Sequence, residues 1–411
     1  MDFSNPNVVI ILASTVLIIS YVFGLVAKRT NIPSVLLLIL LGIGLSEFLK
    51  SYGVSSSDLM PVLRILGIIG LIMIVLEAAM DLRITKDKYA LIGKSFIAAF
   101  VILMLTACSI AGIAVFLFET TFLSGMLYGA PLAIISSAII IPSVGNMVES
   151  KKEFIIYESA FSDIFGIMAF YFSLSLLQSE DSSTTVMLSF LLNLTLSFIV
   201  AIASSYIIVF FFKDMKSASR LFLLVAIIFI LYCGSDLLNL YPLIIVLGFG
   251  LALANHERFF KIFRNTYNPE AQDAIIRIKE EFQLITSETA FVLRTFFFVV
   301  FGMAINLSSL LSFKVFMISV AVLVAIYLSR YVILKVLLKD GIMPELTLAP
   351  RGLLTILLLY SIPATLAVPG FDQGIFLYVI LITSLIMTFG LIIDRSTPDP
   401  VNEANKTKVE S

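Results

Sequence analysis

The sequence has no tryptophan, one histidine and two cysteines, and charged residues make up only 13% of its 411 positions. An ordinary soluble domain is about 25% charged. One histidine, His256, and two cysteines in apolar runs, Cys108 and Cys233, are too few for a zinc or haem site, so we expect no cofactor. The same scarcity argues against an enzyme. The net charge of −1 predicts no nucleic-acid partner.

Apolar residues are abundant instead, at 60% of the chain. No soluble fold of this length can bury so much apolar surface, so the sequence predicts an all-α integral membrane protein in contact with lipid. A spanning helix needs about 20 residues. We expect a membrane domain over residues 1–394 and a short polar tail over 395–411. About thirteen apolar runs are candidate helices: 7–27, 33–49, 61–81, 95–118, 126–148, 154–177, 186–212, 219–235, 241–255, 283–305, 312–336, 345–367 and 373–393.

Positive charge alternates with these runs. Most of the 27 Lys and Arg residues follow odd-numbered runs, and Arg330 is counted among those after the eleventh. The even-numbered sides carry only Lys50, Arg64 and Lys314. By the positive-inside rule, this alternation predicts a multi-pass protein of the inner (plasma) membrane. The N-terminus should lie outside the cell and the C-terminus in the cytoplasm.

Weak internal symmetry links the two halves of the chain. Ala130-Pro131, near the start of the fifth run, recurs as Ala349-Pro350 near the start of the twelfth. Pro33 opens the second run and Pro242 opens the ninth, and a Gly-x-Gly follows each. Every pair is seven runs apart, and an odd offset reverses direction across the membrane. This pattern is typical of inverted repeats.

Four charged side chains are expected inside the membrane, where each costs about 2.5–3.5 kcal/mol without a partner or water. At about 1.5 Å per residue, Glu158 lies about 6 Å deep and Arg351 about 9 Å, so we expect a structural salt bridge between them. Asp163 and Arg294 lie deeper, at about 14 and 16 Å.

Asp163 is the strongest candidate for an ion-binding residue. A carboxylate near the middle of the membrane can hold a proton or a cation, but not both well, and this competition is the minimum chemistry of an exchanger. The alternative is a structural ion pair with Arg294. Arg294 is either the counter-ion of the empty site or a structural residue, and it cannot trade protons because arginine stays protonated.

Two runs carry residues that can interrupt a helix. The fifth contains Ser136, Ser137 and Pro142, and the twelfth, its symmetry mate, contains Pro350 and Gly352. A broken helix exposes backbone carbonyls that can coordinate a cation. An ordinary proline kink is the alternative interpretation.

At these residues the chain resembles the cation:proton antiporter superfamily, which includes the bacterial sodium/proton exchangers. Glu158-Ser159-Ala160-Phe161-Ser162-Asp163 is similar to the family's Glu-Ser-x-x-Asn-Asp motif, which puts Asp163 in the place of the ion-binding aspartate. Ala349-Pro350-Arg351-Gly352 resembles its Pro-Arg-Gly motif, whose arginine pairs with the glutamate matching Glu158. Arg294 matches the family's basic residue before Phe-Phe and Gly.

The chain departs from the family at two places. Ser162 replaces the Asn or Asp before the key aspartate, and Ser136-Ser137 stands where the family has Thr-Asp-Pro, nearer to the Ser-Ser-Thr of the glutathione-gated potassium efflux branch. The predicted ion site therefore comprises Asp163, Ser162, Ser159, Ser136 and Ser137, with a single acid. Less negative charge leaves the identity of the cation open among Na+, K+ and Li+.

The resemblance implies crossed broken helices in the fifth and twelfth runs and a mobile core, 95–177 and 312–393, beside a scaffold, 7–81 and 186–305. It also implies a homodimer and alternating access. We therefore predict exchange of a monovalent cation, with Na+ ranked before K+ and Li+, for protons, one for one and electroneutral. The alternative is a channel-like cation efflux system gated by a separate cytoplasmic subunit.

Overall fold

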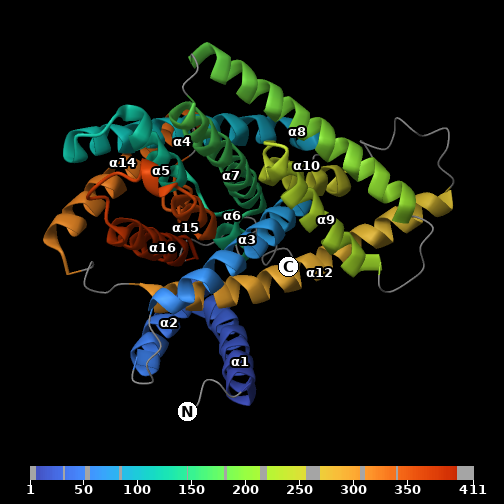
Figure 1. Ribbon diagram of the computed structural model, residues 1–411, viewed down its shortest axis with the longest axis horizontal. Coiled ribbons are helices and arrows are strands. Elements are labelled where there is room, and N and C mark those ends of the chain that lie inside the picture. The colour runs from blue at the N-terminus through green and yellow to red at the C-terminus, as the bar shows by residue number, and fades with distance from the viewer. Residues whose placement is uncertain are drawn as a thin grey trace, which may run out of the picture. The chain divides into compact units, whose positions relative to one another are not determined.

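The computed structural model describes residues 6–30, 33–50, 56–82, 86–145, 147–179, 183–212, 220–255, 269–305, 311–338 and 341–395. Within these ranges the chain is helical and has no strand, as its apolar runs predict (Figure 1). His256 and the polar tail after Arg395 lie outside the described residues.

Each predicted apolar run coincides with one helix or with shorter helical pieces, which confirms the all-α membrane fold. Within the described ranges, 8 helices are long and apolar enough to cross a membrane, and shorter apolar helices accompany them. The unbroken helices are α1 (Pro6–Thr30), α2 (Ser34–Lys50), α3 (Ser56–Asp81), α4 (Tyr89–Phe118), α7 (Glu149–Gln178), α8 (Ser183–Phe212), α9 (Arg220–Leu237), α10 (Pro242–Ala254), α12 (Pro269–Ala304), α14 (Phe313–Leu337) and α16 (Gln373–Arg395).

The fifth and twelfth runs are broken, as their Pro, Gly and Ser residues predict. The fifth divides into α5 (Phe122–Ala133) and α6 (Ser137–Ser143), with extended backbone between them. The twelfth was expected to be helical over 345–367, but only α15 (Leu353–Tyr360) and a short turn at Ala364–Leu366 are helical. The residues before Leu353 are extended or turn, because Pro350 lacks an N–H donor and disfavours a helical residue before it.

The chain forms two compact units. Unit 1 comprises residues 1–60, 90–170 and 298–411, and unit 2 comprises 61–89 and 171–297. This division reflects packing, whereas the predicted division into scaffold and core concerns motion. The division of the helices into a scaffold and a mobile core therefore remains a prediction.

Unit 1 contains both broken helices. Within it α15 packs against α5, α14 against α16, and α1 against α2 (Figure 1). Gly42 of α2 and Gly302 at the end of α12 allow backbones to touch, since a Cβ on Gly42 would lie 2.9 Å from the Gly302 Cα. Small residues at such contacts are typical of membrane helices.

Unit 2 is built around α10, which packs against α8 and α9 (Figure 1). Asn255 ties its C-terminal end to α3, because the side-chain amide donates to the backbone carbonyls of Leu82 and Leu251 at 2.8 and 2.9 Å. The Lys279 ammonium on α12 donates to the carbonyl of Ala254 at 3.1 Å. A cation at the negative end of a helix is favourable, so Lys279 and Asn255 fix the end of α10.

Candidate ion-binding site

The two broken helices meet at their breaks within unit 1. The N–H of Ser136, in the extended stretch between α5 and α6, donates to the carbonyl of Pro350 at 2.9 Å. A Cβ on Gly352 would lie only 2.7 Å from the Cβ of Ser136. Glycine at 352 therefore allows this close approach, and the crossing of broken helices that the family resemblance implies is present.

Arg351 and Thr355 satisfy the carbonyl groups at the end of α5. The Arg351 guanidinium donates from Nε to Leu132 at 2.8 Å and from Nη2 to Ala133 at 3.3 Å. The Thr355 hydroxyl donates to the Pro131 carbonyl at 2.9 Å. A helix end leaves such carbonyls without helical partners and carries partial negative charge. Arg351 is fully buried and caps this end with a positive charge.

The opposite side of the break faces α7. Ser162 accepts a hydrogen bond on its hydroxyl oxygen from the N–H of Ile135 at 3.0 Å. The hydroxyl of Ser137, at the start of α6, donates to Oδ2 of Asp163. Ser162 and Asp163 are adjacent on α7, so two consecutive side chains bind the break, one at a backbone N–H and the other at a hydroxyl group. The structure thus brings together four of the five predicted site residues: Asp163, Ser162, Ser137 and Ser136.

The second carboxylate oxygen of Asp163 distinguishes it from the other charged groups nearby. Asp163 is only 9% exposed, and its Oδ1 has no hydrogen-bond partner among the described residues. A buried carboxylate oxygen without a partner is costly unless a proton or a cation neutralises it. The arrangement can therefore bind either one.

Ser159 is the fifth predicted site residue. Its side chain is buried on α7, and its hydroxyl donates to the carbonyl of Ile156 in the preceding turn at 3.1 Å. This bond uses the hydroxyl proton but leaves oxygen lone pairs free. Its part in ion binding stays a prediction.

The expected salt bridge between Glu158 and Arg351 is wrong. Glu158 is held by Arg330 of α14, with Nη1 to Oε1 at 2.5 Å and Nη2 to Oε2 at 2.9 Å. Matching depths place two residues at one level of the membrane but do not place them on facing sides of neighbouring helices. The Arg351 guanidinium instead donates to backbone carbonyls, including that of Ala349 at 2.6 Å.

Arg330 is the buried charged residue near the site that the sequence interpretation missed. It was counted with the cytoplasmic charges, but it lies inside α14 and is 1% exposed. Its Nε also donates to the backbone carbonyl of Glu345 at 2.8 Å. The available signal was its position seven residues before Leu337, the last residue of α14, which places it about 10 Å inside the helix.

Arg294 has its carboxylate partner in unit 2. Its Nη2 lies 2.7 Å from Oε2 of Glu77 on α3. Both side chains are partly exposed, at 16% and 23%. The pair compensates the Arg294 charge within its own unit and supports the structural interpretation of this residue. Asp163 takes its hydrogen bond from Ser137.

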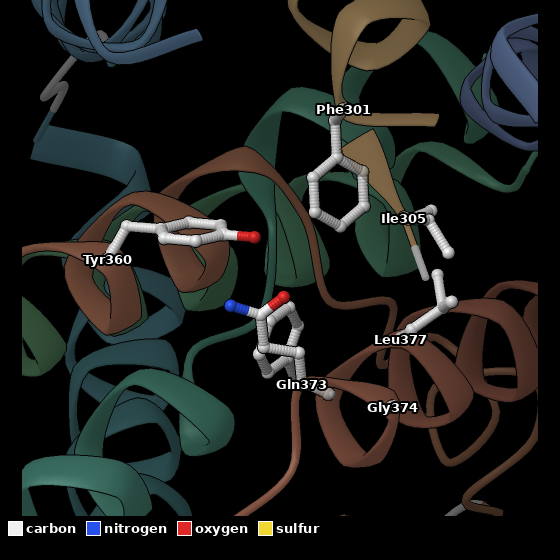
Figure 2. A pocket seen from close by; sticks show the side chains of 7 residues that line it. Phe301, Ile305, Tyr360, Gln373, Gly374 and Leu377 are labelled. Carbon is white, nitrogen blue, oxygen red and sulfur yellow. The ribbon is translucent and has the colours of Figure 1, made fainter. Parts of the chain in front are cut away.

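A small pocket elsewhere in unit 1 is not the ion site. Phe301, Ile305 and the start of α16 line this pocket, and the Tyr360 phenol and the Gln373 amide point into it (Figure 2). None of the described residues that line it is charged. It therefore lacks the acid that a monovalent cation or a transported proton would need.

Comparison with known proteins agrees with this geometry. The family model described as sodium/hydrogen exchanger, transmembrane, matches residues 13–393. No curated protein sequence matches the chain. A structure at pH 8 of the sodium proton antiporter MjNhaP1 from Methanocaldococcus jannaschii is similar, with TM-score 0.68 and 21% identity over 94% of this chain and 98% of that one. An electron-microscopy structure of MjNhaP1 gives TM-score 0.69 and 20% identity over 95% and 96%. The chain therefore belongs to the sodium/hydrogen exchanger family.

Proposed function

We propose that this protein is a secondary active transporter that exchanges one monovalent cation, Na+ by preference, for one proton at Asp163. The observation that carries the proposal is the Oδ1 oxygen of Asp163, which is buried at the crossing of two broken helices and has no hydrogen-bond partner among the described residues. Membership of the sodium/hydrogen exchanger family supports the type of reaction and the preference for Na+.

The two substrates compete because they neutralise the same carboxylate. When a proton binds one oxygen, the carboxylate loses its negative charge and no longer attracts a cation. A cation binds the ionised carboxylate and excludes the proton. Ser137 donates its own proton to Oδ2, so its oxygen lone pairs can face a cation as a neutral ligand. Ser162 acts differently, because it positions Asp163 by holding the N–H of Ile135.

Transport also needs access from each side in turn. In our proposal the core carries Asp163 across the membrane relative to a scaffold that forms the homodimer. Contacts at the crossing support movement of the core as one body, because Arg351 caps the end of α5 and Asp163 of α7 accepts a hydrogen bond from Ser137 at the start of α6. The distribution of Lys and Arg along the sequence supports insertion in the plasma membrane with the C-terminus in the cytoplasm.

Reconstituted vesicles test the proposal directly. A pH gradient is imposed, and Na+, K+ or Li+ is added while the internal pH is recorded. Wild-type protein should dissipate the gradient with Na+, and Asp163→Asn should insert, fold and lose exchange because its amide cannot exchange a proton. Glu149→Gln is the matched control, since Glu149 is an exposed acid near the start of the same helix.

Wild-type rates in Asp163→Asn would exclude this residue as the ion site. Cation flux that needs no opposing proton and follows the membrane potential would instead indicate a channel. Exchange with K+ but not with Na+ would leave the site intact and overturn only the preference for Na+.

A further inference from the structure

A close apolar contact lies one helical turn from Asp163. Gly166 is three residues further along α7, so it lies on the same face of the helix as Asp163. A Cβ at Gly166 would collide with Cγ1 and Cδ1 of Ile134 and would lie 3.4 Å from Cδ1 of Leu103 on α4. The Ile134 side chain therefore fills the space that the missing side chain of Gly166 leaves open.

Ile134 belongs to the break between α5 and α6. It directly follows α5, and its backbone is extended. The N–H of the next residue, Ile135, donates to the Ser162 hydroxyl oxygen at 3.0 Å. The break therefore contacts α7 on both sides of Asp163 in the sequence, by a hydrogen bond at Ser162 and by the packing of Ile134 on Gly166.

The surroundings of Ile134 are buried and apolar. Ile134 and Leu103 are each 1% exposed, and Gly166 is buried between them. One turn away, Oδ1 of Asp163 is buried and has no hydrogen-bond partner among the described residues. A hydrocarbon wall thus stands close to the carboxylate that binds the cation in the proposed function.

We propose that Ile134 is a specificity-determining residue, whose side chain, seated on Gly166, limits the room beside Asp163 and so favours Na+ over the larger K+. An isoleucine side chain offers no ligand atom, so a cation beside it must give up water on that side. Na+ and K+ carry the same charge and differ in size, so the room beside the carboxylate alters their relative affinity. The inference rests on the proposed exchange at Asp163 and adds the residue that sets its selectivity.

The wall that Ile134 forms has little freedom to move back. Its side chain meets Gly166 with no spare room, and close-packed interiors resist such displacement. The backbone is held as well: the N–H of Ile134 donates to the carbonyl of Pro131 at 3.3 Å, and the N–H of Ser136 donates to that of Pro350 at 2.9 Å. A larger cation therefore cannot gain room by pushing the break away from α7.

The test is the ratio of kcat/KM for K+ to that for Na+, measured in vesicles with wild type, Ile134→Ala and Ile110→Ala. Ile134→Ala removes the side-chain carbons beyond Cβ and should raise this ratio about tenfold, because a difference of one methylene in a pocket discriminates by about 10–200-fold. Ile110 of α4 is equally buried, at 1% exposure, and lies about two turns from Leu103. Ile110→Ala should lower the Tm and leave the ratio unchanged.

Gly166→Ala provides a second readout. Added to Ile134→Ala, its Cβ would occupy part of the vacated space, so the ratio in the double variant should return towards that of wild type. The rise in Tm that Na+ or K+ causes in detergent compares the two affinities without transport, and it serves for a variant that folds but transports slowly. An unchanged ratio in Ile134→Ala, an equal shift in Ile110→Ala or a double variant that keeps the full shift would each overturn the proposal.

Failure of this inference differs from failure of the proposed function. Wild-type exchange in Asp163→Asn would remove the ion site itself. Exchange that is lost in Asp163→Asn, combined with a cation preference that does not depend on Ile134, would refute only the role of Ile134. The expected change is a rise from the ratio that wild type shows, so it can be measured even if wild type transports K+ well.

Discussion

The carboxylate of Glu158 is held by both terminal nitrogens of Arg330, at 2.5 and 2.9 Å, and both side chains are 1% exposed. Two parallel bonds between a guanidinium and a carboxylate fix the geometry of both groups. The pair joins α14 to α7, the helix that carries Asp163. The pair therefore helps to fix the position of α7, and with it Asp163, within unit 1. Neither Glu158 nor Arg330 is itself part of the ion site.

Breaking this pair should be more destabilising than neutralising Asp163. Removing one partner of a buried ion pair typically costs about 3–5 kcal/mol, because the other charge is left unpaired. We expect Glu158→Ala and Arg330→Ala each to lower the Tm in detergent more than Asp163→Asn does. The double variant should be no less stable than the worse single variant.

Two controls separate this pair from its neighbours. Glu149 and Lys152 form an exposed pair, and such pairs contribute only about 0.2–1 kcal/mol, so Glu149→Ala should change the Tm little. Glu158 and Arg351 share no hydrogen bond, so their double-mutant cycle should be closer to additive than that of Glu158 and Arg330. Stronger coupling of Glu158 to Arg351 than to Arg330 would contradict the observed pairing.

The contact between Gly352 and Ser136 predicts a rescue experiment. A Cβ at position 352 would overlap the Ser136 side chain and push the two breaks apart. We expect Gly352→Ala to lower the Tm and Ser136→Gly, introduced with it, to recover part of the loss. Gly44→Ala is the control, because nothing lies within 4 Å of a Cβ there. Equal effects at positions 352 and 44 would show that helix propensity, and not the crossing, decides the outcome.

Glu345 gives the protein a stability that depends on pH. Burial raises the pKa of this carboxyl above its ordinary 4.5, despite the opposing effects of Lys151 and Arg330. The folded protein therefore binds this proton more tightly than the unfolded chain does. The resulting stability is fully present below the unfolded pKa and is lost as the pH rises through the folded pKa.

Glu345→Gln cannot lose that proton. The Tm of the variant minus that of wild type should therefore increase as the pH is raised from about 4.5 through the folded pKa of Glu345. Thermal unfolding in detergent at a series of pH values, with Glu149→Gln as a flat reference, measures this. A difference that shrinks with rising pH would mean that the ion pair with Lys151, whose Nζ lies 3.6 Å from Oε2 of Glu345, outweighs the cost of burial.

Much of this fold follows from the sequence because each helix must present enough apolar residues to lipid. The breaks were also predictable, although their position was not: Pro131 and Pro142 lie inside α5 and α6, and the extended backbone lies between them at Ile134 to Ser136. The prolines weaken the helix on both sides. The bonds from Ser136 to Pro350 and from Ile135 to Ser162, which the sequence does not show, stabilise the interruption at this position.

Asp163 could be found from its motif and its depth, but the ionic partners could not. Depth along a helix is one coordinate, whereas a salt bridge also needs the right face of the helix and the right neighbour. Glu158 therefore bonds to Arg330, which was assigned to the cytoplasmic side by counting charges. Arg351 donates to backbone carbonyl oxygens instead of a carboxylate, and a sequence does not show which backbone carbonyls will accept such a bond.

The charge at the site predicts the electrical behaviour of transport. The residue before Asp163 is Ser162, which carries no charge, and Glu158 is already paired with Arg330. If the Asp163 carboxylate alternates between one proton and one monovalent cation, each half-cycle moves the same charge in opposite directions. Arg351 stays bonded to the end of α5 and adds no proton to the count. Exchange should therefore be one for one, electroneutral and insensitive to membrane potential.

Proteoliposomes with a clamped potential test this prediction. A potassium-selective ionophore sets the potential, its sign is reversed, and the rate and end-point of Na+/H+ exchange are compared. Movement of one net charge would couple to the potential by about 2.3 kcal/mol per 100 mV, which is large enough to shift the end-point. A shifted end-point would mean that a second charge moves in each cycle, and the pair of Glu158 and Arg330 is the first place to look for it, because Glu158 lies on the same helix as Asp163. The end-point of Glu158→Gln would then return to independence of potential, provided that the variant folds, whereas an unchanged shift would place the second charge elsewhere.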